Sequence, residues 1–168
     1  TRLRARVPEA RLIVAPHEPT ADHLAPIERW AASAGLRVAR LGESAARSAD
    51  VVVVDRVGVL GDLFALATAA FVGGGFHAAG LHSVLEPAAF GAPVLFGPRH
   101  DASRDARLLI DEDAAVSVVD ADTLRSVVER WLGSPAERGA AGEAAMRVVH
   151  RGLGAAEKSY AIVRELLG

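Results

Sequence analysis

Residues 73–83 have the composition and spacing of a phosphate-binding loop. Three consecutive glycines follow an apolar run at residues 70–72, and a fourth glycine, His82 and Ser83 lead into a helix-like stretch. Glycines let the backbone approach a ligand closely, and the start of a helix offers unpaired N–H groups to an anion. The spacing is not that of Gly-x-Gly-x-x-Gly, where a helix follows at once, and the absence of a nearby Lys excludes a Walker A motif. The residues in question are Gly73, Gly74, Gly75, His82 and Ser83.

Ser83 and Glu86 are spaced as a helix-capping box, in which Ser83 caps the helix and the Glu86 side chain bonds back to the N–H of the cap. Pro87 follows directly and fits that register poorly, because proline prefers the first turn of a helix. A carboxylate at this place could instead accept hydrogen bonds from two sugar hydroxyls. The residues by themselves leave both roles for Glu86 open.

Three loop histidines, His17, His77 and His82, could each donate a hydrogen bond to a phosphate, although a solvated position is the alternative for each. A metal centre is not indicated: the chain has no Cys, no His-x-x-x-His and no acid pair at ligand spacing. Ser83 has no Gly-x-Ser-x-Gly context, so a nucleophilic serine is not indicated either.

Composition excludes several classes of protein. The 168 residues are 51% apolar and 24% charged, which argues against disorder and for one compact domain over residues 1–168. The net charge of -2 gives no excess of cations for nucleic acid, so we expect no nucleic-acid partner. Residues 63–85 lack Asp, Glu, Lys and Arg, but their three consecutive glycines argue against a membrane span.

Short apolar runs alternate with stretches of helical period, as in βαβ units. The sequence therefore predicts an α/β fold, a Rossmann-like doubly wound parallel sheet of about six strands. The valine run at residues 51–54 should be a central strand buried on both faces. We expect strands at 12–15, 36–41, 51–54, 70–72, 93–96 and 116–119, and helices at 21–34, 60–67, 83–90, 102–110, 123–132 and 135–167, the last interrupted near 152–154.

The loops that follow the strands are the expected ligand site, because open parallel sheets bind ligands beyond the carboxyl ends of their strands. Four loops qualify: residues 16–20, 55–58, 73–82 and 97–100. The last helix carries an apolar stripe that packs either on this domain or on a partner domain. The stripe is Leu153, Ala156, Tyr160, Val163 and Leu167.

Residues 71–76, 80–88 and 91–98 together resemble the C-terminal domain of the 3-deoxy-D-manno-octulosonic acid (Kdo) transferases. Shorter matches at 15–18, 55–60 and 154–155 extend the resemblance. It implies a GT-B glycosyltransferase whose second Rossmann-like half binds the nucleotide sugar CMP-Kdo without a metal. It further implies a lipid A precursor as acceptor, lipopolysaccharide biosynthesis as the process, and work at the cytoplasmic face of the inner membrane, with this domain soluble.

The resemblance also assigns residues. It places Gly73, Gly74, Gly75, His82 and Ser83 at the donor phosphate, with His17 nearby, Glu86 at the ribose hydroxyls, and Arg56, Val57 and Gly58 beside the base. In that family the catalytic carboxylate and the acceptor site belong to an N-terminal domain. Since Thr1 begins without Met inside an Arg-rich run, we expect a part of a longer protein that binds donor, has no catalytic residue of its own and transfers nothing alone.

This chain departs from the family pattern at three places. Many members have Pro-Arg-His where this chain has Ala15-Pro16-His17, Asn is frequent where Ser83 stands, and Ser is common where Gly75 stands. One cationic contact is therefore missing or supplied from elsewhere. Two other functions remain open: a GT-B domain or 2-epimerase domain that binds a UDP-sugar, and a non-catalytic nucleotide-binding module whose glycine loop is only a tight turn.

Overall fold

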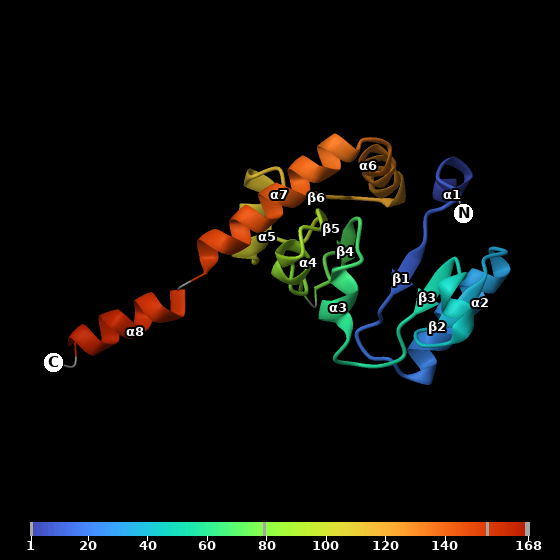
Figure 1. Ribbon diagram of the computed structural model, residues 1–168, viewed down its shortest axis with the longest axis horizontal. Coiled ribbons are helices and arrows are strands. Elements are labelled where there is room, and N and C mark those ends of the chain that lie inside the picture. Colours follow the sequence, from blue (N-terminus) through green and yellow to red (C-terminus); the bar gives the residue numbers. More distant parts are fainter. Residues whose placement is uncertain (1, 79, 154, 167–168) are drawn as a thin grey trace. The chain divides into compact units, whose positions relative to one another are not determined.

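The computed structural model describes residues 2–78, 80–153 and 155–166 (Figure 1). The chain divides into two compact units, Thr1–Leu63 (unit 1) and Phe64–Gly168 (unit 2), and each is described by itself. Helix α3, Leu60–Phe64, crosses from one unit to the next. Each unit holds a three-stranded parallel sheet flanked by helices, so the predicted α/β fold with six parallel strands is confirmed. The strands are divided between two sheets of three.

In unit 1 the strand order is β1-β3-β2, with β1 at Leu12–Val14, β3 at Val51–Val53 and β2 at Val38–Arg40. The central strand β3 is buried along its whole length, as the valine run predicted. Its side chains alternate between two faces, because Val51 and Val53 pack with helix α2 (Ala21–Ser33), whereas Val52 packs with Ala39 and Ala49. Unit 1 also contains helix α1 (Arg2–Arg6) and the 3-10 helix η1 (Ser44–Arg47).

In unit 2 the strand order is β4-β5-β6, with β4 at Ala70–Val72, β5 at Val94–Phe96 and β6 at Ala115–Ser117. The central strand β5 is again completely buried. Val94 and Phe96 face one cluster, which includes Leu109, and Leu95 faces the other, which includes Trp131. The helices are α4 (Leu85–Ala89), α5 (Arg104–Asp111), α6 (Ala121–Gly133), α7 (Pro135–Gly152) and α8 (Ala155–Leu166).

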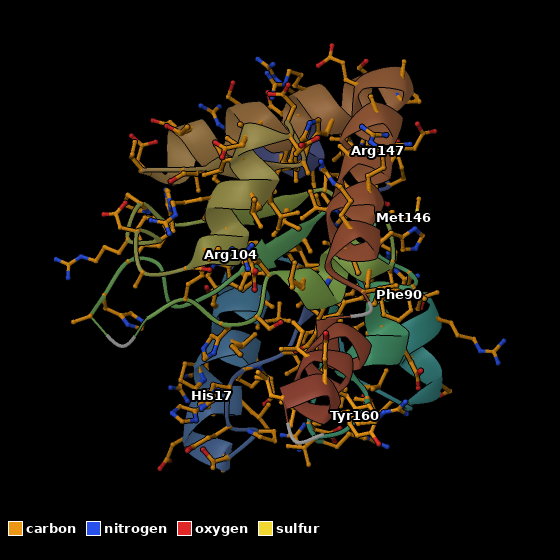
Figure 2. All side chains as sticks on the ribbon, turned by 90° about the vertical axis from the view of Figure 1, so that its left-hand side faces the viewer. His17, Phe90, Arg104, Met146, Arg147 and Tyr160 are labelled. Atoms are coloured by element: carbon orange, nitrogen blue, oxygen red, sulfur yellow. The ribbon has the colours of Figure 1, made fainter. Side chains whose placement is uncertain are left out.

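Helix α7 packs against three other helices of unit 2, namely α4, α5 and α6 (Figure 1). At Gly142 the backbone of α7 packs against Gly91, because an added Cβ at Gly142 would overlap the carbonyl oxygen of Gly91. Met146 lies one turn later on α7 (Figure 2). Its side chain packs against Gly91, because a Cβ added to Gly91 would be 3.4 Å from the Met146 Sδ. A small residue at 142 therefore lets α7 sit directly on the turn between α4 and β5.

The segment 63–85 shows why its low charge does not indicate a membrane span. It contains the end of α3, strand β4 and the glycine loop. Among the described residues no helix combines the length and the apolar character needed to cross a bilayer.

The last helix begins after the predicted interruption, since α7 ends at Gly152 and α8 starts at Ala155. Its apolar stripe does not pack on unit 2 where its side chains are described: Leu153, Tyr160 and Val163 are 64%, 68% and 51% exposed. This contradicts the alternative in which the stripe covers this domain's own sheet. The side chain of Ala156, and Leu167, lie outside the described residues.

A buried carboxylate, Asp50, joins the start of β3 to two cationic segments of unit 1. Arg37 donates through its backbone N–H (2.9 Å) and its Nη2 (2.8 Å), and Arg4 of α1 lies 3.0 Å away. The hydrogen bonds from Arg37, together with the weaker effect of Arg4, hold the pKa of Asp50 well below its usual value. The ionised form is therefore favoured in the folded state.

We predict that Asp50→Asn lowers the melting temperature at pH 7. The difference in melting temperature between this variant and the wild type should become smaller in acid. Because the pKa of Asp50 is lower in the folded chain than in the unfolded chain, the stabilisation is complete above about pH 5, begins to decrease as the pH falls below about 4, and is fully lost only below the folded pKa. Thermal unfolding followed by circular dichroism from pH 7 to pH 3 measures this. Asp62→Asn, on the exposed side of α3, is the control and should match the wild type. A difference for Asp50→Asn that stays constant with pH would contradict the prediction.

Candidate functional site

The glycine loop after β4 is closed by its own backbone. The N–H of His82 donates to the carbonyl oxygen of Gly73 over 3.2 Å, which joins the two ends of the loop. Gly74 has a φ of +95°, and a Cβ at this position would overlap the carbonyl oxygen of Gly80. Only glycine fits at position 74 on both counts. This is a compact turn of backbone at the carboxyl end of β4.

A second loop packs against the first, backbone on backbone. An added Cβ on Gly75 would lie 2.7 Å from the nitrogen of Gly97, which directly follows β5. The N–H of Arg99 then donates to the carbonyl oxygen of Gly75 over 2.9 Å. The family's frequent Ser at position 75 would not fit this arrangement. The loops that end two neighbouring strands therefore pack directly against each other, with Gly75 and Gly97 buried at the contact.

Helix α4 begins two residues later than predicted, which overturns the capping box. Its N-cap is Val84, with no side-chain cap, and Leu85 is its first residue. If Ser83 were the cap, Pro87 would be the first residue whose N–H must donate to the carbonyl four residues earlier, that of Ser83. Proline has no N–H, so this register is unfavourable. With the cap at Val84, Pro87 falls in the first turn, where no N–H is required.

Glu86 is consequently exposed, and it makes no hydrogen bond or ion pair within the part of the chain that the structure describes. The alternative in which it caps the helix is wrong, which leaves its carboxylate available to accept hydrogen bonds. Helix α4 has only five residues, so its dipole is small. An anion near Ser83 would thus be held mainly by loop N–H groups and cations. Ser83 and His82 are both exposed beside the loop.

The other predicted site residues belong to unit 1. His17 lies in the loop after β1 and is exposed (Figure 2). Val57 and Gly58, after β3, are exposed as well, with Val57 78% accessible. The structure therefore places His17 and residues 56–58 at carboxyl ends of unit 1 strands, and residues 73–86 after a strand of unit 2.

Arg56 departs from the simple picture of a base contact, because its guanidinium bonds within unit 1. Its Nη2 donates to the carbonyl of Leu41 over 2.6 Å, and its Nε donates to Asp55 over 3.0 Å. The bond from Arg56 also lowers the pKa of Asp55. Arg56 thus fixes the shape of the loop after β3, and Val57 of the same loop is largely open to solvent.

The loop at 97–100 is one of the four expected ligand loops, although its sequence marks no particular residue as a ligand contact. Phe96 and His100 form an edge-to-face pair with ring centroids 5.2 Å apart, and Nδ1 of His100 is buried without a hydrogen-bond partner. The signal that could have marked this loop was Gly97 directly after an apolar strand. No three His, Asp or Glu side chains within the described ranges gather as metal ligands, and metal independence stays a prediction.

Comparisons with known proteins agree on one group. No protein-family model matches the chain. A 3-deoxy-D-manno-octulosonic acid transferase of Bordetella pertussis is 31% identical over 98% of this chain and 39% of its own length. The transferase of Chlamydia muridarum is 41% identical over 53% of this chain and 21% of its own length, and that of Aquifex aeolicus is 38% identical over 39% and 19%. The chain thus spans well under half of these relatives.

Two solved structures share the fold. The crystal structure of the C-terminal CMP-Kdo binding domain of WaaA from Acinetobacter baumannii matches with a TM-score of 0.76 and 25% identity, over 88% of this chain and 80% of that domain. Sucrose-phosphate synthase from Thermosynechococcus elongatus matches with a TM-score of 0.59 and 15% identity, over 98% of this chain and 48% of that one, which shows a common fold alone.

We predict that Gly97→Ala destabilises the chain by about 1–3 kcal/mol, because its Cβ would meet the backbone of Gly75 at 2.5 Å and one loop would have to move. Gly139→Ala, on an open face of α7, is the matched control and should stabilise the helix by about 0.5–1 kcal/mol. Urea unfolding curves measure both. If the two alanines act alike, the contact between the loops is not a constraint.

Proposed function

We propose that this chain, which matches the C-terminal domain of the Kdo transferases in sequence and in fold, binds the nucleotide sugar CMP-Kdo as a glycosyl donor. The observation that carries the proposal is the likeness to the CMP-Kdo binding domain of WaaA, at 25% identity over 88% of this chain. The glycine loop supports it independently, because Gly73 and Gly74 stay partly exposed at the carboxyl end of β4, where a ligand can reach their backbone.

In such a transfer the bond between the sugar's anomeric carbon and the phosphate oxygen breaks, and an acceptor hydroxyl oxygen takes its place on that carbon. CMP leaves with an added negative charge on its phosphate. Hydrogen-bond donors already in position around the phosphate stabilise this charge without rearrangement. We assign that role to the loop of Gly73, Gly74 and Gly75 together with His82 and Ser83, with His17 near the same phosphate.

Two further contacts complete the proposed donor site. The Glu86 carboxylate accepts hydrogen bonds from the ribose hydroxyls, a role for which its exposed and unpaired state suits it. The loop of Arg56, Val57 and Gly58 borders the base, with Val57 offering apolar contact.

The wider setting follows from the same relatives. We propose that the acceptor is a lipid A precursor and that an N-terminal domain supplies its site and the catalytic carboxylate. The complete enzyme would then act in lipopolysaccharide biosynthesis at the cytoplasmic face of the inner membrane. The share of this chain is to hold the donor.

The first test is calorimetric titration of the chain with CMP, UDP, AMP and NAD. We expect binding of CMP in preference to the others, with a Kd of about 1 mM or better, which corresponds to ~4 kcal/mol. Preference for UDP would indicate a UDP-sugar donor instead. Binding of none of the four would contradict donor binding by this chain and favour a loop that is only a tight turn.

We also predict that Glu86→Ala weakens CMP binding about tenfold or more while leaving stability within about 0.5 kcal/mol of the wild type. A bond to a charged group is worth about 1.5–3 kcal/mol, and an exposed side chain that caps no helix contributes little to folding. Glu143→Ala, exposed on α7, controls for the loss of one negative charge. Lost stability with unchanged affinity would show that Glu86 serves the fold.

A further inference from the structure

Arg99 differs from other exposed arginines of unit 2 in how its backbone is held. Its N–H donates to the carbonyl of Gly75 at 2.9 Å, in the middle of the glycine loop. Two residues earlier, Gly97 touches Gly75 so closely that neither position admits a Cβ. The base of the Arg99 side chain is therefore fixed against the loop to which we assign the donor phosphate.

The other end of this segment is fixed as well. The N–H of Ser103 donates to the carbonyl of His100 at 2.8 Å, and the Ser103 side chain accepts from the N–H of Ala106 at 3.2 Å, which caps α5. Residues 97–103 thus run between two anchored points. Fixing the backbone in advance lowers the entropy that a cation would lose when it binds a ligand.

The Arg99 guanidinium is exposed and pairs with none of the residues that the structure describes. Arg104, the first residue of α5, is exposed and unpaired in the same sense (Figure 2). A cation at the start of a helix meets the positive end of the helix dipole, which is unfavourable unless an anion is present. Asp101 lies between the two arginines and Asp105 follows Arg104 in α5, but neither carboxylate forms an ion pair with Arg99 or Arg104 among the described residues.

A buried nitrogen next to Arg99 points the same way. Nδ1 of His100 has no hydrogen-bond partner, although buried polar atoms nearly always have one. A ligand bound beside Arg99 would supply the missing partner. Both groups follow β5, at the carboxyl edge where parallel sheets bind ligands.

We propose that Arg99 binds an anionic group of the donor. This rests on the proposed function, since CMP-Kdo carries a phosphate and the carboxylate of an acidic sugar. The guanidinium fork matches both groups, with two parallel N–H donors to two oxygens. The chain as a whole has a net charge of -2, so it has no general attraction for an anion and needs a local cation.

The test compares Arg99→Gln with the wild type in calorimetric titrations with CMP and with CMP-Kdo. We expect Arg99→Gln to lose at least tenfold in affinity for CMP-Kdo, and Arg99→Lys to lose less because it keeps the charge without the fork. An equal loss for CMP assigns Arg99 to the phosphate, and a loss for CMP-Kdo alone assigns it to the sugar carboxylate. Both results support the proposal.

Arg147→Gln is the matched control, because it removes an arginine that is likewise exposed, from α7 (Figure 2). It should bind both ligands as the wild type does, and all three variants should keep the wild-type melting temperature. Wild-type affinity in Arg99→Gln, or an equal loss in Arg147→Gln, would overturn the role of Arg99 alone. A wild-type chain that binds neither ligand would overturn the donor function as well.

Discussion

The contact between the backbones of Gly75 and Gly97 is the constraint on which the candidate site depends. A side chain at either position would force the loops after β4 and β5 apart. Because these strands are hydrogen-bonded neighbours, their loops leave the same edge of the sheet, and only glycine lets them touch. The contact joins the two loops through their buried glycines, and the backbone N–H of Arg99 adds a hydrogen bond between them.

The two ends of the strands have different physical roles. At the amino end of β3, Asp50 is buried with its charge satisfied by Arg37 and Arg4, an arrangement that serves folding. At the carboxyl end, Val57 is open to solvent, so its side chain contributes little to folding and is accessible to a ligand. Central strands buried on both faces hold these ends in place. The loops can therefore bind a ligand while the strands supply the packing of the core.

The start of α4 shows what sequence patterns can and cannot predict. Ser83 and Glu86 have the spacing of a capping box, and that local pattern predicted the wrong first residue. Pro87 decides the register, because it has no N–H to give at the position where a helix first needs one. The strands, by contrast, were predicted to within a few residues, since an apolar run such as that at 51–54 has no other stable place than a buried strand.

The sequence by itself determined the alternation of strands and helices, the six parallel strands and the resemblance to Kdo transferases, whereas the structure divided the strands between two sheets. Only the tertiary structure decided three other matters. Glu86 does not cap the helix, and the Arg56 guanidinium is hydrogen-bonded to Leu41 and Asp55. The backbone N–H of Arg99 is hydrogen-bonded to the glycine loop. Each of these depends on which backbone groups meet in the folded chain. The separation of two residues along the sequence does not give the distance between them in space.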